Sequence, residues 1–230
     1  MPRVSIITPL HNKWPYVVET IQSVLAQTMP DWEMIVVENG STDNGPEMVR
    51  QFSDARIRLV VSPQCGPGVA RNFGLGLAAG DWVLFLDADD LIAPDYLEER
   101  LGLLEKNPEA DLLAGMWEEF KDSAPGQKIA RKPTAHGSTA MELANAAIAY
   151  APWAVHATLV KKSRLLDGRL WPEEMDGLPS EDSAFWFPVV DGASVVWSEK
   201  GGALYRVQTE TSRNEIKDVE RWIRAVLKIS

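Results

Sequence analysis

The sequence predicts an α/β fold with a Rossmann-like, mostly parallel sheet flanked by helices. Short apolar runs recur along the first half, helical patterns separate them, and nearly every residue within a run is apolar. Strands buried on both faces of a parallel sheet have this continuous apolar character. Repeated strand, helix, strand units also imply right-handed crossovers between parallel strands.

The first half is predicted to contain four strands, at residues 3–8 (RVSIIT), 32–38 (WEMIVVE), 57–62 (IRLVVS) and 82–87 (WVLFLD). Residues 16–27 and 68–80, which lie between these runs, carry apolar side chains at helical spacing and are predicted to be helices. The stretch GPGVAR at 66–71 begins like a dinucleotide-binding fingerprint, but it lacks the third glycine and follows the third strand. We therefore interpret it as a helix start and disfavour an NAD enzyme.

The second half breaks the alternating rhythm. A helix is predicted at about 94–107, opened by Pro94 and closed before Pro108. The remaining predicted elements, in order, are a polar loop or hairpin that is a candidate mobile flap (121–137), helices at 138–150 and 180–190, and strands at 193–199 and 202–207. We expect one domain over residues 1–230, in which 1–107 and 108–230 form two halves.

Composition and charge limit the classes of partner and location. The chain has 230 residues, 45% of them hydrophobic, and a net charge of -10, so a nucleic-acid backbone would be repelled on average. Cys65 is the single cysteine, the first residues lack the apolar run of a signal peptide, and no stretch approaches the ~20 apolar residues of a membrane span. We expect a soluble cytoplasmic protein that does not bind nucleic acid.

Three carboxylates, Asp87, Asp89 and Asp90, follow the predicted strand at 82–87. Like charges held close together destabilise a fold unless a cation or a ligand offsets the repulsion, so we expect a metal, a polar ligand or a water-facing loop here. Polar residues also follow the first strand, beginning at Thr8, and the second strand, in ENGSTD (38–43). Parallel strands place these groups on one rim of the sheet, where ligands bind.

Several segments resemble, in order and approximate spacing, the inverting family 2 glycosyltransferases of GT-A fold. They are VSIITPLHN, IVVENGSTD, GPGVARNFGLGLAAGDWVLFLDADD followed by APDYL, SEDSAFW and YR, within residues 2–206. The resemblance implies a nucleotide-diphospho-sugar donor, a Mn or Mg ion, and transfer of the sugar to an acceptor hydroxyl or amine. It also implies a nucleotide-sugar-binding half at 1–107 and a more variable acceptor-binding half at 108–230.

By the same resemblance, Asp87-Ala88-Asp89 matches the D-x-D motif of the family. Asp89 would bind the metal together with the donor diphosphate, and Asp87 would contact the ribose or a metal-bound water. A metal at this position makes the acidic cluster tolerable and neutralises charge on the departing diphosphate. Asp90 is expected to be a loop or helix-capping acid.

Positions that hold the nucleobase and ribose in the family match Thr8, Pro9, Glu38, Asn39 and Arg71. The commonest pattern has two aspartates where this chain has Glu38 and Asn39. Either side chain accepts a hydrogen bond from a base N–H, so the base stays open, with a UDP-sugar favoured. On local grounds alone, NGSTDN is equally well a turn before a helix capped by Thr42 or Asp43.

The second half carries the residues that the resemblance assigns to catalysis. Asp182 matches the catalytic base, and Glu181 is expected to support the acceptor or orient the base. The alternative for this pair is a helix N-terminus that favours acids through its dipole. Tyr205 and Arg206 match a YR that precedes a flexible segment over the donor diphosphate, so Arg206 is expected to help bind the nucleotide-sugar, although Gln208 stands where a histidine is often found. Trp153 is assigned to the acceptor side.

Two other classes of function remain as alternatives. A sugar-phosphate nucleotidyltransferase needs a glycine-rich basic signature near the first strand, which TPLHNKWP lacks, and a non-catalytic nucleotide-binding or scaffold protein would tolerate loss of Asp182. QTETSRN does not match the Q-x-x-R-W motif of processive relatives, so transfer of single sugars is favoured. The acceptor is left open among glycans, lipid-linked and small molecules. The predicted C-terminal helix (214–230) would pack on its own domain, form a homodimer or contact a membrane surface.

Overall fold

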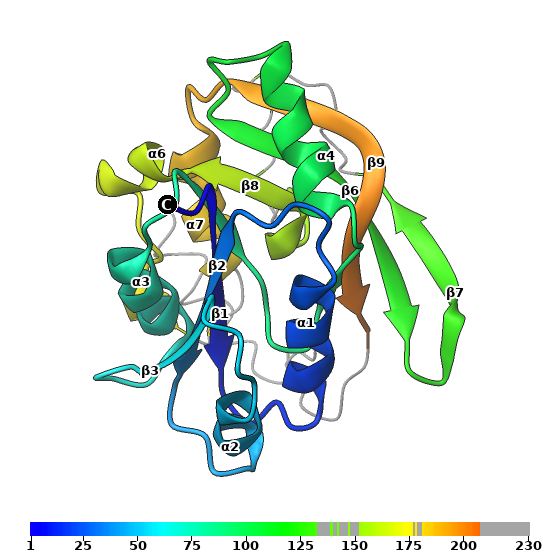
Figure 1. Ribbon diagram of the computed structural model, residues 1–230. Coiled ribbons are helices and arrows are strands. Elements are labelled where there is room, and N and C mark those ends of the chain that lie inside the picture. The colour runs from blue at the N-terminus through cyan, green and yellow to red at the C-terminus, as the bar shows by residue number, and fades with distance from the viewer. Residues whose placement is uncertain are drawn as a thin grey trace.

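The computed structural model describes residues 1–132, 139, 142, 147, 152–176, 178 and 181–207 (Figure 1). The predicted helix at 138–150, apart from three single positions, and the predicted helix at 214–230 lie outside the described residues, as do Gln208 and the part of the candidate flap at 133–137.

Four parallel strands form the N-terminal half of the sheet, as the apolar runs predict. In spatial order they are β3 (Ile57–Val61), β2 (Trp32–Glu38), β1 (Val4–Leu10) and β4 (Trp82–Phe85). The connecting helices are α1 (Tyr16–Leu25), α2 (Gly45–Arg50) and α3 (Pro67–Leu77). Figure 1 shows α1 and α3 on opposite sides of these strands, so apolar residues are needed on both faces of the sheet.

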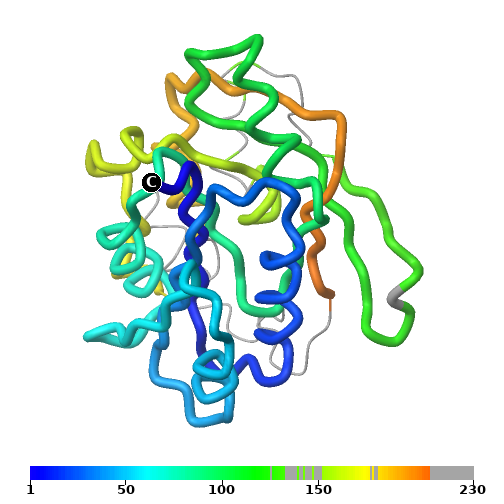
Figure 2. The backbone as a smooth tube through the Cα atoms, in the orientation of Figure 1, coloured from blue at the N-terminus to red at the C-terminus, as the bar shows by residue number. Residues whose placement is uncertain are grey.

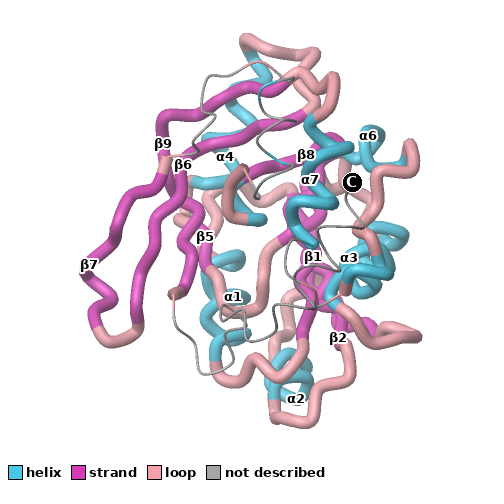
Figure 3. The backbone as a smooth tube through the Cα atoms, turned by 180° about the vertical axis from the view of Figure 1, so that it is seen from behind, coloured by secondary structure: helices cyan, strands magenta, loops and turns pink. Residues whose placement is uncertain are grey.

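The C-terminal half extends the same sheet with mixed pairing. After β4 the order continues through β8 (Thr158–Lys161), β6 (Leu112–Lys121), β9 (Val195–Arg206) and β5 (Leu91–Ile92), while β7 (Ala124–Arg131) pairs with β6. β6 and β7 confirm the hairpin alternative for the described part of residues 121–137. Figure 3 shows this hairpin extending from the body of the fold. The predicted GT-A type sheet, mostly parallel and flanked by helices, is confirmed.

α4 (Tyr96–Gly102) and α7 (Glu181–Val190) agree with predicted helices, with shifted ends, and the 3₁₀ turn η1 (Leu103–Glu105) continues α4. The short helix α6 (Lys162–Leu166) and the 3₁₀ turns η2 (Val155–Ala157) and η3 (Glu173–Met175) were not predicted. The two strands predicted at 193–199 and 202–207 are one continuous strand, β9 (Val195–Arg206). Gly202, which lies between the two predicted parts, has a positive φ of 102° but does not end the strand. The fourth strand ends at Phe85 rather than Asp87. The acidic cluster therefore lies in a loop.

The chain after β4 lies beside the end of β9, although the two are far apart in the sequence. Leu91 of β5 pairs antiparallel with Leu204 of β9, and Figure 2 shows the orange end of β9 next to this part of the chain. The same stretch contacts α1, since the hydroxyl of Thr20 donates to the carbonyl of Asp90 at 2.9 Å. β9 and α1 thus enclose the acidic loop from two sides.

An aromatic cluster fixes α7 against the parallel half. The rings of Trp171 and Phe185 stack with centroids 4.0 Å apart, and Phe85 meets them edge-on at 5.5 and 5.6 Å. All three side chains are buried, and each contributes roughly 2 kcal/mol through burial. This packing carries the first residues of α7 to the end of β4, where the acidic loop begins.

None of the helices among the described residues has both the length and the apolar character needed to cross a membrane.

Candidate functional site

The loops after β1 and β2 are joined by hydrogen bonds at the carboxyl edge of the sheet, as the strand pattern predicts. Asn12, whose φ of 51° is positive, accepts the amides of Thr42 and Asp43 on Oδ1 at 2.8 and 3.2 Å. The amide of Trp14 donates to Oδ2 of Asp43 at 2.7 Å. α2 has Asn44 at its N-cap without a side-chain bond, while Asp43 accepts the amide of Gly45 at 3.0 Å.

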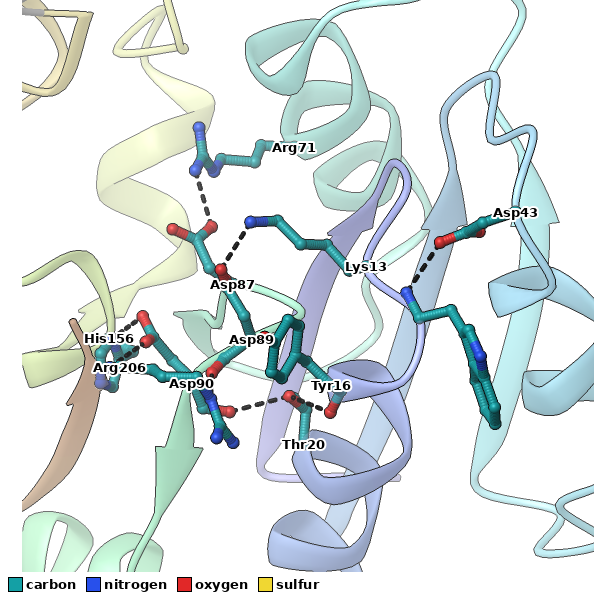
Figure 4. Close-up of polar contacts among 11 residues, drawn as sticks. Lys13, Tyr16, Thr20, Asp43, Arg71, Asp87, Asp89, Asp90, His156 and Arg206 are labelled. Atoms are coloured by element: carbon teal, nitrogen blue, oxygen red, sulfur yellow. Dashed lines mark hydrogen bonds and ion pairs between the residues drawn. The ribbon is translucent and has the colours of Figure 1, made fainter. Parts of the chain in front are cut away.

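The acidic loop after β4 presents two of its carboxylates to cations. Nη2 of Arg71 donates to Oδ1 of Asp87 at 2.8 Å, and Nζ of Lys13 donates to Oδ2 of Asp89 at 2.5 Å (Figure 4). Burial opposes ionisation of Asp87, but Arg71 and, more weakly, Lys13 hold the pKa of its carboxyl below the usual range. The acids predicted to cluster at the rim are thus paired with two basic residues, Lys13 from the loop after β1 and Arg71 from α3.

Arg71 connects the acidic loop with α7. Its guanidinium lies 4.1 Å over the ring of Trp171, and Nη1 lies 3.5 Å from Oε1 of Glu181. Burial disfavours the charge on Arg71, but the carboxylates of Asp87, Glu181 and Asp182 raise its pKa above the ordinary value. The two acids predicted on the acceptor side therefore lie within electrostatic reach of the D-x-D motif.

The N-terminus of α3, the helix that carries Arg71, is capped by Asp176, a residue distant in the sequence. Asp176 accepts the amides of Gly68 and Val69 at 2.6 and 3.2 Å, at the start of the helix. A Cβ at Gly68 would lie 2.4 Å from Oδ1 of Asp176, so only glycine leaves room for this cap. Residues 66–71 do start a helix, as predicted, but the capping carboxylate comes from more than 100 positions later in the sequence.

The residues predicted to hold the nucleobase lie around the same edge. Asn39 is 5% exposed and its Oδ1 accepts the amide of Gly66 at 2.9 Å, while Glu38 accepts the amide of Ser41. Pro9 follows Thr8 near the end of β1 and is half-buried. The hydroxyl of Thr8 is fully buried and has no hydrogen-bond partner within the described residues. An orphaned hydroxyl at this position is a polar group that a ligand would satisfy.

The third acid of the cluster, Asp90, lies in the loop, which is one of the two expected positions, but its side chain is buried. It is 2% exposed, its Oδ1 accepts the amide of Arg206 at 2.8 Å, and its Oδ2 lies 3.2 Å from Nδ1 of His156. Burial, together with Asp89 and Asp87, raises the pKa of Asp90 well above its usual value, and burial lowers the pKa of His156 to about 4. Both shifts favour the uncharged forms of the two side chains.

Arg206, predicted to help bind the nucleotide-sugar, has its guanidinium buried among protein groups. Its Nε donates to the carbonyl of Asp89 at 2.8 Å, Nη2 lies 2.7 Å from Glu19, and Nη1 contacts Asp122. The side chain is 2% exposed and lies over the rings of Tyr16 and Phe120. These contacts assign Arg206 to bracing the acidic loop, a role that the sequence did not reveal.

Trp153, predicted on the acceptor side, is a packing residue. Its ring is 2% exposed and meets Trp186 and Trp197 edge-on at 5.0 and 5.7 Å. A ring buried on both faces offers no surface on which a sugar could stack, so the acceptor-side prediction for Trp153 is corrected.

The donor set of the acidic loop fits a hard divalent cation that is shared with a substrate. Within the described part of the chain, no three His, Cys, Asp or Glu side chains form a metal-binding group. Asp87 and Asp89 supply two carboxylates from one loop. Mg²⁺ is commonly held by one or two carboxylates and completed by substrate phosphates and water, and Mn²⁺ accepts similar oxygen donors.

Comparison with known proteins supports the family suggested by the motifs. The model for glycosyl transferase family 2 matches residues 5–150. The chain belongs to this family. A Haemophilus influenzae glycosyltransferase is 41% identical over 110 residues, which are 46% of this chain and 44% of the relative. TuaG of Bacillus subtilis is 38% identical over 135 residues, which are 57% of this chain and 54% of TuaG. TuaG is named as a teichuronic acid biosynthesis glycosyltransferase.

A third relative, the UDP-Glc:alpha-D-GlcNAc-diphosphoundecaprenol beta-1,3-glucosyltransferase WfgD of Escherichia coli, is 39% identical over 105 residues, 45% of this chain and 42% of WfgD. The chain thus spans about half the length of these family 2 relatives.

Two solved structures share the fold of this family 2 chain. TarS of S. aureus in complex with UDP-GlcNAc superposes with a TM-score of 0.81 at 21% identity, over 100% of this chain and 65% of that one. The mannosyltransferase PcManGT of Pyrobaculum calidifontis, in complex with GDP-Man and Mn²⁺, superposes with a TM-score of 0.67 at 21% identity, over 91% of this chain and 58% of that one. The whole sheet, including its mixed half, is thus a shared architecture.

Proposed function

We propose that this chain transfers single sugars from a nucleotide-diphospho-sugar, with a UDP-sugar favoured, to an acceptor hydroxyl or amine, with inversion at the anomeric carbon. The observation that carries the proposal is the position of Arg71, which contacts Asp87 of the D-x-D motif and Glu181 at the start of α7. Donor-side and acceptor-side acids are thereby brought to one place. This is the arrangement that a single displacement requires.

The donor side is proposed to bind a metal through Asp89 and Asp87, together with the diphosphate. When bound, Mn or Mg would neutralise the charge that develops on the departing nucleoside diphosphate. The buried, unpartnered hydroxyl of Thr8 supports a nucleotide at the ends of β1 and β2, beside Pro9, Glu38 and Asn39. WfgD is named for a UDP-sugar, TarS was crystallised with UDP-GlcNAc, and PcManGT with GDP-Man and Mn²⁺.

Asp182 is proposed as the general base. Asp182 follows Glu181 in the first turn of α7, and its carboxylate is near enough to Arg71 to raise the pKa of that guanidinium, so it supplies a carboxylate close to the D-x-D loop. As the acceptor oxygen or nitrogen bonds to the anomeric carbon, the bond from that carbon to the diphosphate oxygen breaks. The acceptor proton passes to the carboxylate of Asp182. Attack on the face opposite the leaving group inverts the configuration.

Other properties of the proposed enzyme remain predictions. The acceptor is a glycan, a lipid-linked sugar or a small molecule. The name of WfgD, with its diphosphoundecaprenol acceptor, gives the lipid-linked class some support. The cytoplasmic location, the absence of nucleic-acid partners, and a homodimer or membrane contact through residues 214–230 are likewise predictions.

Thermal unfolding with UDP, GDP, dTDP and CMP, each with and without Mn²⁺, tests the donor site first. A nucleotide at about 100 times its dissociation constant adds ~2.7 kcal/mol to the free energy of unfolding. For a chain of this length that corresponds to a rise in Tm of roughly 5 to 10 °C. We expect one nucleoside diphosphate to give a Mn-dependent shift that disappears in Asp89→Asn.

Turnover then separates the enzyme from the alternatives. A shift accompanied by transfer from the matching nucleotide-sugar supports the proposal, and a shift without transfer to any acceptor favours the non-catalytic nucleotide-binding protein. Release of pyrophosphate from a nucleoside triphosphate and a sugar phosphate would instead indicate the nucleotidyltransferase. Absence of a shift with every nucleotide would contradict the proposed donor site.

A further inference from the structure

We propose that Asp90 is a positioning residue of the donor site, which holds the backbone of Asp89 in place and does not itself bind metal. The inference rests on the proposed function, because it concerns the same D-x-D loop. It goes further by assigning a role to Asp90, the third acid of the cluster, which is not part of the D-x-D motif.

Alternating burial along the loop separates Asp90 from the other two acids. Ala88 and Asp90 are 1% and 2% exposed, whereas Asp87 and Asp89 are only partly buried. The carboxylates of Asp87 and Asp89 meet Arg71 and Lys13, while the carboxyl of Asp90 meets Arg206 and His156. The side chain of Asp90 thus serves a set of partners different from those of the motif acids (Figure 4).

Contacts from three other elements engage the polar groups of Asp90. Its amide donates to the carbonyl of Asp87 at 3.1 Å, and its carbonyl accepts the hydroxyl of Thr20 in α1 at 2.9 Å. Its carboxyl accepts the amide of Arg206 in β9 at 2.8 Å and lies 3.2 Å from Nδ1 of His156 in η2. One residue therefore joins the loop to α1, β9 and η2.

Arg206 transmits this arrangement to Asp89. The amide of Arg206 is held by Asp90, and its Nε donates to the carbonyl of Asp89 at 2.8 Å. Its two terminal nitrogens are held by Glu19 and Asp122. Asp89 is thus fixed through its backbone, which leaves its carboxylate directed at Lys13. Loss of the Asp90 carboxyl would remove the bond that fixes the backbone of Arg206, and so would loosen the hold of Arg206 on the backbone of Asp89.

The geometry requires a planar group with one acceptor toward Arg206 and one polar atom toward the imidazole. A carboxamide has the same shape and supplies both, so Asp90→Asn should preserve the arrangement. Asp90→Ala supplies neither. A metal ligand behaves differently, because replacing a carboxylate ligand with an amide removes the negative charge that holds the cation.

The experiment measures Mn²⁺ binding to the full chain by electron paramagnetic resonance, alone and with UDP. The chains compared are wild type, Asp90→Asn, Asp90→Ala and Asp89→Asn. We expect Asp90→Asn to bind close to wild type and Asp90→Ala to bind at least about tenfold more weakly, the usual cost of losing a group that orients a ligand. Asp89→Asn should lose binding. Equal loss in Asp90→Asn and Asp89→Asn, or wild-type binding by Asp90→Ala, would overturn the inference.

A matched control separates positioning from general destabilisation. Glu33 is a carboxylate near the opposite end of β2, where it accepts the hydroxyl of Ser5 at 2.7 Å and the amide of Ala79 at 2.6 Å. Glu33→Ala removes comparable hydrogen bonds without touching the loop, so it should lower stability but leave Mn²⁺ affinity unchanged. Equal weakening in Glu33→Ala and Asp90→Ala would contradict a positioning role.

Hydrogen exchange gives a readout that needs no metal. If wild type binds no Mn²⁺, the proposed metal dependence fails, but the positioning role of Asp90 remains open to test. We expect Asp90→Ala, and not Asp90→Asn or Glu33→Ala, to accelerate amide exchange in residues 86–92 and 203–207. Unchanged exchange in Asp90→Ala would refute the role whatever the metal data show.

Discussion

Nζ of Lys13 lies 2.5 Å from Oδ2 of Asp89, and the two side chains are only 19% and 14% exposed. The ammonium group forms an ion pair with the carboxylate oxygen that a divalent cation would bind. Bonds from Asn12 and Trp14 to the loop after β2 hold the chain on either side of Lys13. The lysine is therefore an internal counter-ion that a metal has to displace.

Lys13→Met should strengthen Mn²⁺ binding in the absence of nucleotide. Removal of a competing ion pair of roughly 1 kcal/mol corresponds to about a fivefold rise in affinity. Isothermal titration calorimetry of wild type, Lys13→Met and Lys13→Arg measures this, since arginine keeps the cation. An affinity in Lys13→Met equal to or below that of wild type would show that Lys13 does not compete with the metal.

Asp182→Asn should lower turnover by roughly a hundredfold or more, the span expected for loss of a general base. Asp182 is not among the residues proposed to bind the donor, so the thermal shift with nucleotide and Mn²⁺ should be retained. Glu181→Gln is the neighbouring comparison, and because its contact with Arg71 is 3.5 Å long, we expect a smaller loss. Unchanged turnover in Asp182→Asn would rule out the assignment as base.

The parallel half of the fold was predictable because its signal is local. Residues 32–38 read as a strand from their own apolar run, and β2 has the same bounds. The position of the D-x-D motif follows from that pattern, since a buried strand has to end before a charged loop. Arg71 lies near the start of α3, the helix start predicted at residues 66–71, so its place at the rim follows from the same local pattern.

The bracing contacts were not predictable, because they join residues that are distant in the sequence. The local sequence around His156 does not indicate a partner for it. His156 faces Asp90 because β8, which follows it in the chain, pairs with β4. Glu19 is an ordinary surface acid of a helix until β9 places Arg206 against it. Burial of Trp153 similarly depends on Trp186 and Trp197, which come from later elements. Such partners are determined by strand order, which the local pattern leaves open.

Arg71→Met should destabilise the fold as well as the donor site. The guanidinium is 5% exposed, and its removal leaves Asp87 and Glu181 without their shared counter-charge. Breaking a buried pair costs a few kcal/mol, and since Asp87 is 31% exposed we expect about 2 kcal/mol in the free energy of unfolding. Urea denaturation measures this.

The double variant Arg71→Met with Asp87→Asn tests the same ion pair. If the loss arises from the uncompensated charge of Asp87, neutralising that residue should recover part of the stability lost in Arg71→Met. Strictly additive losses in the two single variants would contradict direct coupling between them.

Tyr96 gives the fold a predictable sensitivity to alkaline pH. Its hydroxyl donates to the carbonyl of His156 at 2.8 Å, and burial raises the pKa of the phenol from 10.0 to about 12, against the smaller opposing effect of Arg100. Below pH 10 this contribution is fully present. Above pH 10 the unfolded chain loses the phenol proton while the folded chain keeps it, so stability falls by about 1.4 kcal/mol per pH unit until the folded pKa is reached.

Tyr96→Phe lacks the ionisable group, so urea unfolding from pH 9 to 12 should show a steeper decline for wild type than for the variant. Parallel curves would mean that the phenol ionises equally in both states, and that the contact with His156, the residue behind Asp90, is not held in solution.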